Sequence, residues 1–284
     1  FYEGSELLMY PPDWIDRAER IGLGYELGDG AVKRTRASRG ARAIGCDPAE
    51  GGDSSCWSVV DEFGLCELVT MKTPDTNVIP AVTISLMGRW RVNPRNVVFD
   101  RGGGGKEHAD RLRALGYPVW TMAFGESVAP DPRATSPGLK QKVDEREDRY
   151  AYKNRRAEVY DRLRQFLDPA RGMVGPGGRL EGVPVRVCGR DGTTPEDVRM
   201  TGWGLVPSSS APQYAELRRQ MAPIPLTYDG EQRLYLLPKN KPTSTYTGQT
   251  LSSLLGRSPD ELDSLVLALH GMCGRPPRPV GGAS

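Results

Sequence analysis

Residues 43–53 read AIGCDPAEGGD, a short apolar run that ends at Asp47 and passes into a glycine-rich turn. An apolar run of this length indicates a buried β-strand. A second run, NVVFDRGGGG at residues 96–105, ends at Asp100 and also leads into glycines. Polar residues at the ends of buried strands are where sheet proteins commonly place their chemistry. The two stretches therefore predict an α/β protein with an acidic site at one edge of its sheet.

The rest of the chain supplies the other elements of such a fold. Runs rich in Val, Ile and aromatic residues predict strands at Ala41–Asp47, Cys56–Glu62, Leu65–Lys72, Asn96–Asp100 and Pro118–Ala123. Helical spacing and end signals predict helices at 78–90, His108–Leu115, 152–167, Gln213–Met221 and Pro259–His270. Hairpins are expected at Arg179–Cys188 and Leu226–Leu237. If the first strand lies in mid-sheet, parallel to the fourth, Asp47 and Asp100 end side by side.

A third acidic segment, SPDELDSL at residues 258–265, opens the last predicted helix. Packed across the same sheet edge, that helix would offer Asp260, with Asp263 one turn further on. Acidic groups gathered in this way repel one another unless a divalent cation neutralises them. Such a cluster can hold two metal ions about 4 Å apart, which suits phosphoryl chemistry. Asp53 could add a carboxylate in the outer shell.

Each acid also has a purely structural explanation. Asp47 and Asp53 flank ordinary turn residues. The segment at 258–261 is a good helix start, with a capping box and proline at the first helical position. The case for a metal site rests on the three acidic segments occurring together, in this order.

Composition places few limits on function. The chain has 284 residues, 38% apolar content and a net charge of +2, with 34 glycines and 24 prolines. We expect a linker or the remnant of a missing N-terminal domain at 1–40, a folded domain at 41–272 with an insertion at about 168–250, and a disordered tail at 273–284. The first residue is Phe1, which suggests a fragment of a longer chain. The lack of a long apolar stretch or signal-peptide pattern predicts a soluble intracellular protein.

Spacing and composition speak against two familiar kinds of site. The glycines at 102–105 fail the P-loop pattern, because Asp100 and Glu107 stand at two of its required positions. Five cysteines without a Cys-x-x-Cys pair, and only two histidines, argue against a zinc site of the usual kind. Basic side chains near the predicted strands are candidates for binding a phosphate backbone: Arg39, Arg42, Lys106, Arg155 and Arg156.

Four motifs in this order resemble the nuclease domain of phage large terminase subunits. They are the two strand-end stretches at 45–53 and 100–104, YKNRRAE at residues 152–158, and the acidic helix start at 258–265. Ser264 stands where that family usually has alanine, and the segment at 168–210 is longer than the family's usual connection.

This resemblance implies a ribonuclease-H-like nuclease domain at 41–272, with 1–40 as a linker or the remnant of a missing N-terminal ATPase domain. The activity it implies is that of an endonuclease that uses Mg²⁺ or Mn²⁺ to cut concatemeric viral DNA during packaging. Asp47, Asp100 and Asp260 would be the metal-binding catalytic carboxylates, with Asp263 as a further ligand. Implied partners are double-stranded DNA, the packaging ATPase domain, the small terminase subunit and the portal, in the host cytoplasm. We expect the isolated domain to be monomeric.

Two other functions remain open from the sequence. The turns after Asp47 and Asp100 also resemble the phosphate loops of actin-like kinases and ATPases, which need a second domain with its own sheet. Alternatively, the chain is a non-catalytic module that docks on DNA or on the portal, and its acids only cap helices and form turns. Such a module would bind DNA with salt-dependent affinity and would not respond to metal.

Overall fold

The computed structural model describes residues 8–26, 42–49, 54–61, 63–128, 152–169, 202–230 and 233–273, and the backbone of short strands between 174 and 200. Its centre is a five-stranded sheet with the order β3-β2-β1-β4-β5. The strands are β1 (Ala43–Asp47), β2 (Ser54–Asp61), β3 (Gly64–Lys72), β4 (Val97–Asp100) and β5 (Trp120–Met122). β2 is antiparallel to β1 and β3, whereas β1, β4 and β5 run parallel. The predicted mixed α/β sheet, with the first strand in the middle, is confirmed.

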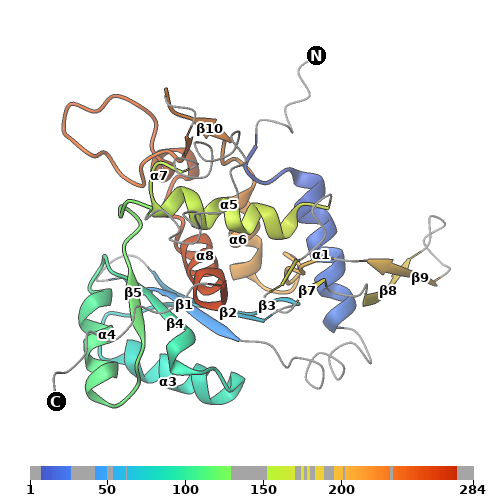
Figure 1. Ribbon diagram of the computed structural model, residues 1–284, viewed down its shortest axis with the longest axis horizontal. Coiled ribbons are helices and arrows are strands. Elements are labelled where there is room, and N and C mark those ends of the chain that lie inside the picture. The colour runs from blue at the N-terminus through green and yellow to red at the C-terminus, as the bar shows by residue number, and fades with distance from the viewer. Residues whose placement is uncertain are drawn as a thin grey trace, which may run out of the picture.

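Helices cover both faces of this sheet (Figure 1). On one face lie α3 (Val78–Trp90) and α4 (Gly105–Ala114), and on the other α8 (Asp260–Cys273) packs against β1, β2 and β4. α5 (Arg155–Leu167) and α6 (Pro212–Met221) lie over α8. α8 is buried almost all round because it is sandwiched between the sheet and these helices. This burial on all sides explains why α8 has a long apolar run, which a helix at the surface would not have.

The approach of α8 to the sheet depends on Gly45. A Cβ at this position would lie 2.1 Å from the Ser264 backbone oxygen and 2.3 Å from the Ala268 backbone nitrogen. Only glycine allows the helix backbone to touch β1 so closely. Nearby, Ser264 forms a buried 2.8 Å hydrogen bond with Ser58 of β2, which gives the serine at this position a structural role.

The predicted linker at 1–40 contains a helix that belongs to the core. α1 (Pro12–Glu26) buries Ile15, Ala18 and Ile21, and the preceding Met9 and Tyr10 are fully buried. The linker interpretation is therefore wrong for residues 8–26. The sequence alone did not show that these apolar residues are buried, because their partners lie far away along the chain.

The predicted insertion at about 168–250 is also partly core. Trp203, Leu217 and Met221 are buried in the same cluster as α8, and the Trp203 indole donates to the Asp61 backbone oxygen at 3.1 Å. The hairpin expected at Leu226–Leu237 is present as β10 (Thr227–Tyr228) and β11 (Leu234–Tyr235).

The hairpin predicted at Arg179–Cys188 is wrong. β8 (Val183–Cys188) pairs with β9 (Pro195–Met200), and β6 (Val174–Gly175) pairs with β7 (Gly178–Arg179). The short elements that remain are the 3-10 helix η1 (Pro94–Asn96) and α7 (Leu251–Leu255). No helix within the described residues is long and apolar enough to cross a membrane.

A buried histidine on α8 is expected to make the stability of the fold depend on pH. The His270 ring lies 5.1 Å from the Trp120 ring, and its Nδ1 is 3.2 Å from an Arg162 guanidinium nitrogen. Burial, reinforced by the positive charges of Arg162 and Arg155, lowers the pKa of His270 from its usual 6.5 to about 3. Because the unfolded chain takes up this proton near pH 6.5, the stability from the neutral ring is complete above that pH. It is lost as the pH falls toward 3.

We therefore expect His270→Gln to flatten the pH dependence of stability between pH 6.5 and 3. The glutamine can still accept a hydrogen bond, but it does not titrate. The wild-type slope should exceed the variant's by at most about 1.4 kcal/mol per pH unit. Urea unfolding of both proteins at a series of pH values measures this difference, and parallel curves would contradict it.

Candidate metal centre

The ends of two neighbouring strands bring Asp47 and Asp100 to one sheet edge. β1 and β4 are parallel, with Cys46 opposite Phe99, so the aspartate that follows each residue lies at the same level. Asp47 is 5% exposed, and Asp100 is partly buried. The Gly102 backbone N–H donates to Asp100 Oδ1 at 3.2 Å, which orients this carboxylate. The predicted pairing of the two acids is confirmed.

α8 adds two further acids from its first turn. Asp260 is 4% exposed and Asp263 is completely buried. The negative charges of Asp263, Asp100 and Asp260 all act on Asp47. The structure thus gathers four aspartates, Asp47, Asp100, Asp260 and Asp263, which we call the acid cluster.

A lysine that the sequence did not single out lies among these acids. The Lys239 ammonium nitrogen is 3.1 Å from Asp263 Oδ2, 3.3 Å from Asp47 Oδ2 and 3.5 Å from Asp260 Oδ1. Lys239 follows β11. Its segment is held against α7 by two backbone hydrogen bonds, from Leu251 N–H to the Pro238 oxygen and from Ser252 N–H to the Lys239 oxygen. It lies in an irregular stretch, so no local pattern pointed to it.

The electrostatics of the cluster are those of crowded acids with one compensating cation. Burial raises the pKa of Asp47 well above its ordinary value; Lys239 opposes this shift, and the neighbouring acids add to it. Burial, followed by the charge of Asp263, also raises the pKa of Asp100. Burial alone would lower the pKa of Lys239, but the charges of Asp263 and Asp47 raise it above its ordinary value. The site therefore favours positive charge at the centre of the acids.

The donor chemistry of the cluster fits a hard divalent cation. Within the described residues, no group of three or more Asp, Glu, His or Cys side chains is arranged so that it could hold a metal ion as it stands. Instead, the Lys239 ammonium is held by three carboxylates. An ammonium in this position is a stand-in for a cation, and carboxylate oxygens are the ligands that Mg²⁺ and Mn²⁺ prefer. Which of these acids bind metal stays a prediction.

Arg156, a candidate for DNA binding, is buried beneath the cluster. It is 7% exposed, and its guanidinium contacts Asp263 at 3.3 Å. Its proposed role as a DNA contact is therefore wrong. A surface role was assumed because a charged residue is usually exposed, whereas here the buried charge is paired with an acid 107 positions away.

The other predicted residues differ in their surroundings. Lys106 is exposed at the start of α4. Arg42 donates to the Trp90 backbone oxygen at 2.8 Å, and Arg155 pairs with Glu158. Arg39 and Asp53 lie outside the described residues.

A buried acid beside the cluster was also missed. Glu261 is 1% exposed and accepts a hydrogen bond from the Gln220 side-chain amide. The same amide's oxygen accepts from the Leu262 backbone N–H at 3.0 Å. Gln220 of α6 thus provides a hydrogen-bond acceptor for a backbone N–H in the first turn of α8. This contact helps to fix the turn that carries Asp260 and Asp263.

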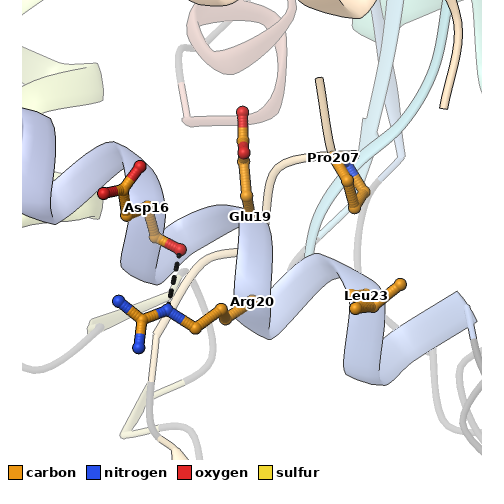
Figure 2. Close-up of a pocket in the computed structure, with 5 residues that line it drawn as sticks. All are labelled: Asp16, Glu19, Arg20, Leu23 and Pro207. Atoms are coloured by element: carbon orange, nitrogen blue, oxygen red, sulfur yellow. Dashed lines mark hydrogen bonds between the residues drawn. The ribbon is translucent and has the colours of Figure 1, made fainter. Parts of the chain in front are cut away.

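A surface pocket lies elsewhere, on α1 (Figure 2). It has a volume of about 320 Å³ and is lined by Asp16, Glu19, Arg20, Leu23 and Pro207. Arg20 Nε donates to the Asp16 backbone oxygen at 3.4 Å. None of these residues belongs to the acid cluster, whose burial and charge make it the better candidate site.

Comparison with known proteins supports the fold. No protein-family model and no curated protein matches the sequence. The chain is similar to the nuclease domain of the large terminase subunit gp2 of bacterial virus Sf6, at 16% identity and a TM-score of 0.59. Mutant forms of that domain with manganese and beta-thujaplicinol, and with calcium, match at 14% and 15% identity, both with a TM-score of 0.60. Each match covers 93% of this chain and 99% of the other. The predicted fold, the ribonuclease-H-like fold of terminase nuclease domains, is confirmed.

Proposed function

We propose that this chain is a divalent-metal-dependent DNA endonuclease that cuts concatemeric viral DNA during genome packaging. The observation that carries the proposal is the acid cluster, four aspartates of which three contact the ammonium of the partly exposed Lys239. It lies on a fold shared with the nuclease domain of a phage large terminase subunit. Related structures of that domain contain manganese or calcium.

The acid cluster would hold the ions, Mg²⁺ or Mn²⁺ and two in number. Asp47 and Asp100 would provide ligands from the sheet edge, and Asp263 and Asp260 from α8. When bound, such ions activate a water and stabilise the leaving oxygen of a phosphodiester. The protein's own contribution is to hold the carboxylates together against their repulsion, largely shielded from solvent, and to withdraw Lys239 from among them.

The wider role follows from the same resemblance. We propose that the substrate is double-stranded DNA and that the chain works with a packaging ATPase domain, the small terminase subunit and the portal in the host cytoplasm. Lys106, which is exposed on the helix that follows Asp100, is the best placed of the predicted DNA contacts. The kinase alternative loses support, because the described part of the chain holds one five-stranded sheet and otherwise only two-stranded ones.

Asp100→Ala tests the proposal directly. We expect it to lower metal-dependent cleavage of double-stranded DNA by roughly a thousandfold, because a metal ligand is lost. The fold should survive, and the metal-free protein should be at least as stable, because one member of a repelling cluster is removed. Gel assays of cleavage and DNA binding, with a thermal melt of each protein, measure these effects.

Undiminished cleavage by Asp100→Ala would remove this acid from the site. A wild-type protein that binds DNA but neither cuts it nor responds to metal would instead support the docking module.

Lys239→Met should make the cluster a better metal site. Without the ammonium, the acids lose their compensating charge, so the metal-free protein should be destabilised by about 2 kcal/mol, a value reduced for the partial exposure of Lys239. The same change frees the position among the carboxylates, so Mn²⁺ should bind about tenfold more tightly and raise the melting temperature more than in the wild type.

Lys241→Met is the matched control, because Lys241 is exposed in the same segment. Thermal melts with and without Mn²⁺ compare the three proteins. A Lys239→Met protein whose metal response is no larger than that of Lys241→Met would contradict competition between lysine and metal.

A further inference from the structure

Two side chains of α5 hold one acid of the cluster. The Tyr160 hydroxyl donates to Asp263 Oδ1 at 2.7 Å, and an Arg156 guanidinium nitrogen donates to Asp263 Oδ2 at 3.3 Å. Arg156 and Tyr160 are four positions apart, so they project from the same face of the helix. All three side chains are buried.

These contacts set the direction in which Asp263 presents its oxygens. Oδ1 accepts the hydrogen bond from Tyr160, whereas Oδ2, which Arg156 also contacts, faces the Lys239 ammonium at 3.1 Å. A cation that replaced the ammonium would therefore meet Oδ2. Asp260 is held less closely, because its contacts are with Lys239 and the partly exposed Arg257, each at 3.5 Å.

α5 itself is fixed firmly enough to act as a support. The Asn154 side chain caps its first turn by accepting from Ala157 N at 3.1 Å, and the Arg156 N–H donates to the Phe124 backbone oxygen at 3.0 Å. The Arg156 guanidinium also lies 4.4 Å from the centre of the Phe124 ring. In mid-helix, the Tyr160 backbone oxygen accepts from the Tyr10 hydroxyl at 3.0 Å. The donors to Asp263 thus stand on a rigid, buried element.

We propose that Tyr160 and Arg156 are positioning residues, which hold the Asp263 carboxylate in the orientation that binds the divalent ion. The inference rests on the proposed function. A hydrogen-bonded donor behind a metal-binding carboxylate fixes its orientation, and loss of such a partner typically weakens metal binding by about 10- to 100-fold. Tyr160 supplies this hold without adding charge, and Arg156 compensates part of the negative charge of Asp263.

The test compares Tyr160→Phe with Tyr152→Phe. Tyr160→Phe keeps the buried ring and removes only the hydroxyl that holds Asp263. Tyr152→Phe removes a hydroxyl that donates to Asp161 at 2.8 Å, a residue outside the acid cluster. Mn²⁺ binding is measured by calorimetry without DNA, and the Mn²⁺ concentration for half-maximal cleavage is measured separately. A second variant is Arg156→Lys, which keeps the positive charge but loses the planar guanidinium group.

We expect Tyr160→Phe to raise the Mn²⁺ dissociation constant by about tenfold or more, with a parallel rise in the Mn²⁺ needed for cleavage. Arg156→Lys should shift both in the same direction, and Tyr152→Phe should leave both unchanged. A purely structural role would lower the melting temperature without changing the dissociation constant, and that result would overturn the proposal. If the wild type cuts DNA and binds Mn²⁺ but Tyr160→Phe binds it equally well, the positioning role fails while the nuclease stands. A wild type that binds no Mn²⁺ would overturn both.

Discussion

Asp263→Asn is expected to reduce metal-dependent cleavage by roughly a thousandfold or more, whereas Asp260→Asn should keep a reduced but measurable rate. Asp263 is completely buried, makes the shorter contact with Lys239 and is held by two donors from α5. Its charge is also the leading electrostatic cause of the raised pKa of Asp100. Asn has nearly the size of Asp, so the comparison isolates the charge.

The stability of the two variants should differ in the same order. Asp263→Asn leaves the buried Arg156 guanidinium without its acid and takes one acid from Lys239, so it should destabilise the metal-free protein. Asp260→Asn should have a smaller effect, because Arg257 keeps other acidic neighbours. Cleavage is therefore compared well below both melting temperatures. Near-normal cutting by Asp263→Asn, with none by Asp260→Asn, would exchange the roles of the two acids.

Gly45→Ala should both destabilise the protein and stop cleavage. Its methyl group would collide with backbone atoms of Ser264 and Ala268, which cannot move unless α8 moves. Overpacking of this kind costs about 1–3 kcal/mol or more. A displaced α8 also carries Asp260 and Asp263 away from Asp47, and shifts of about 1 Å in a catalytic arrangement can cost about a hundredfold in rate.

Gly88→Ala is the matched control for this change. Gly88 lies within α3, and a Cβ there would meet nothing within 4 Å. Alanine is the better helix former by about 1 kcal/mol, so this variant should be as stable as the wild type or more so. Urea unfolding and a cleavage assay measure both variants. If Gly45→Ala retained wild-type stability and rate, close packing of α8 on β1 would not be what holds the site together.

The sequence predicted the sheet and the meeting of its acids because these depend on local patterns and strand order. β1 and β4 are short apolar runs, each ending in aspartate, and their parallel pairing follows from a mixed sheet with the first strand in the middle. The start of α8 was equally clear, since Pro259 and the acids after it mark a helix N-terminus.

What the sequence did not reveal depends on contacts between distant residues. Lys239 reaches Asp47 across 192 positions from an irregular segment, and Arg156 reaches Asp263 across 107. Tyr10 reaches the α5 backbone across 150 positions, so the segment read as a linker is core. No periodicity or spacing encodes such pairs, and a charged side chain in isolation is correctly expected at the surface.

Cleavage of supercoiled plasmid tests the central claim most directly. Wild-type protein and Asp47→Ala would each be incubated with Mn²⁺, with Mg²⁺ or with EDTA. The acid cluster predicts nicking or linearisation by the wild type with a divalent ion, none with EDTA, and none by Asp47→Ala under any condition. Cutting that persists in EDTA, or that is equal in the Asp47→Ala protein, would contradict a metal-dependent nuclease built on these aspartates.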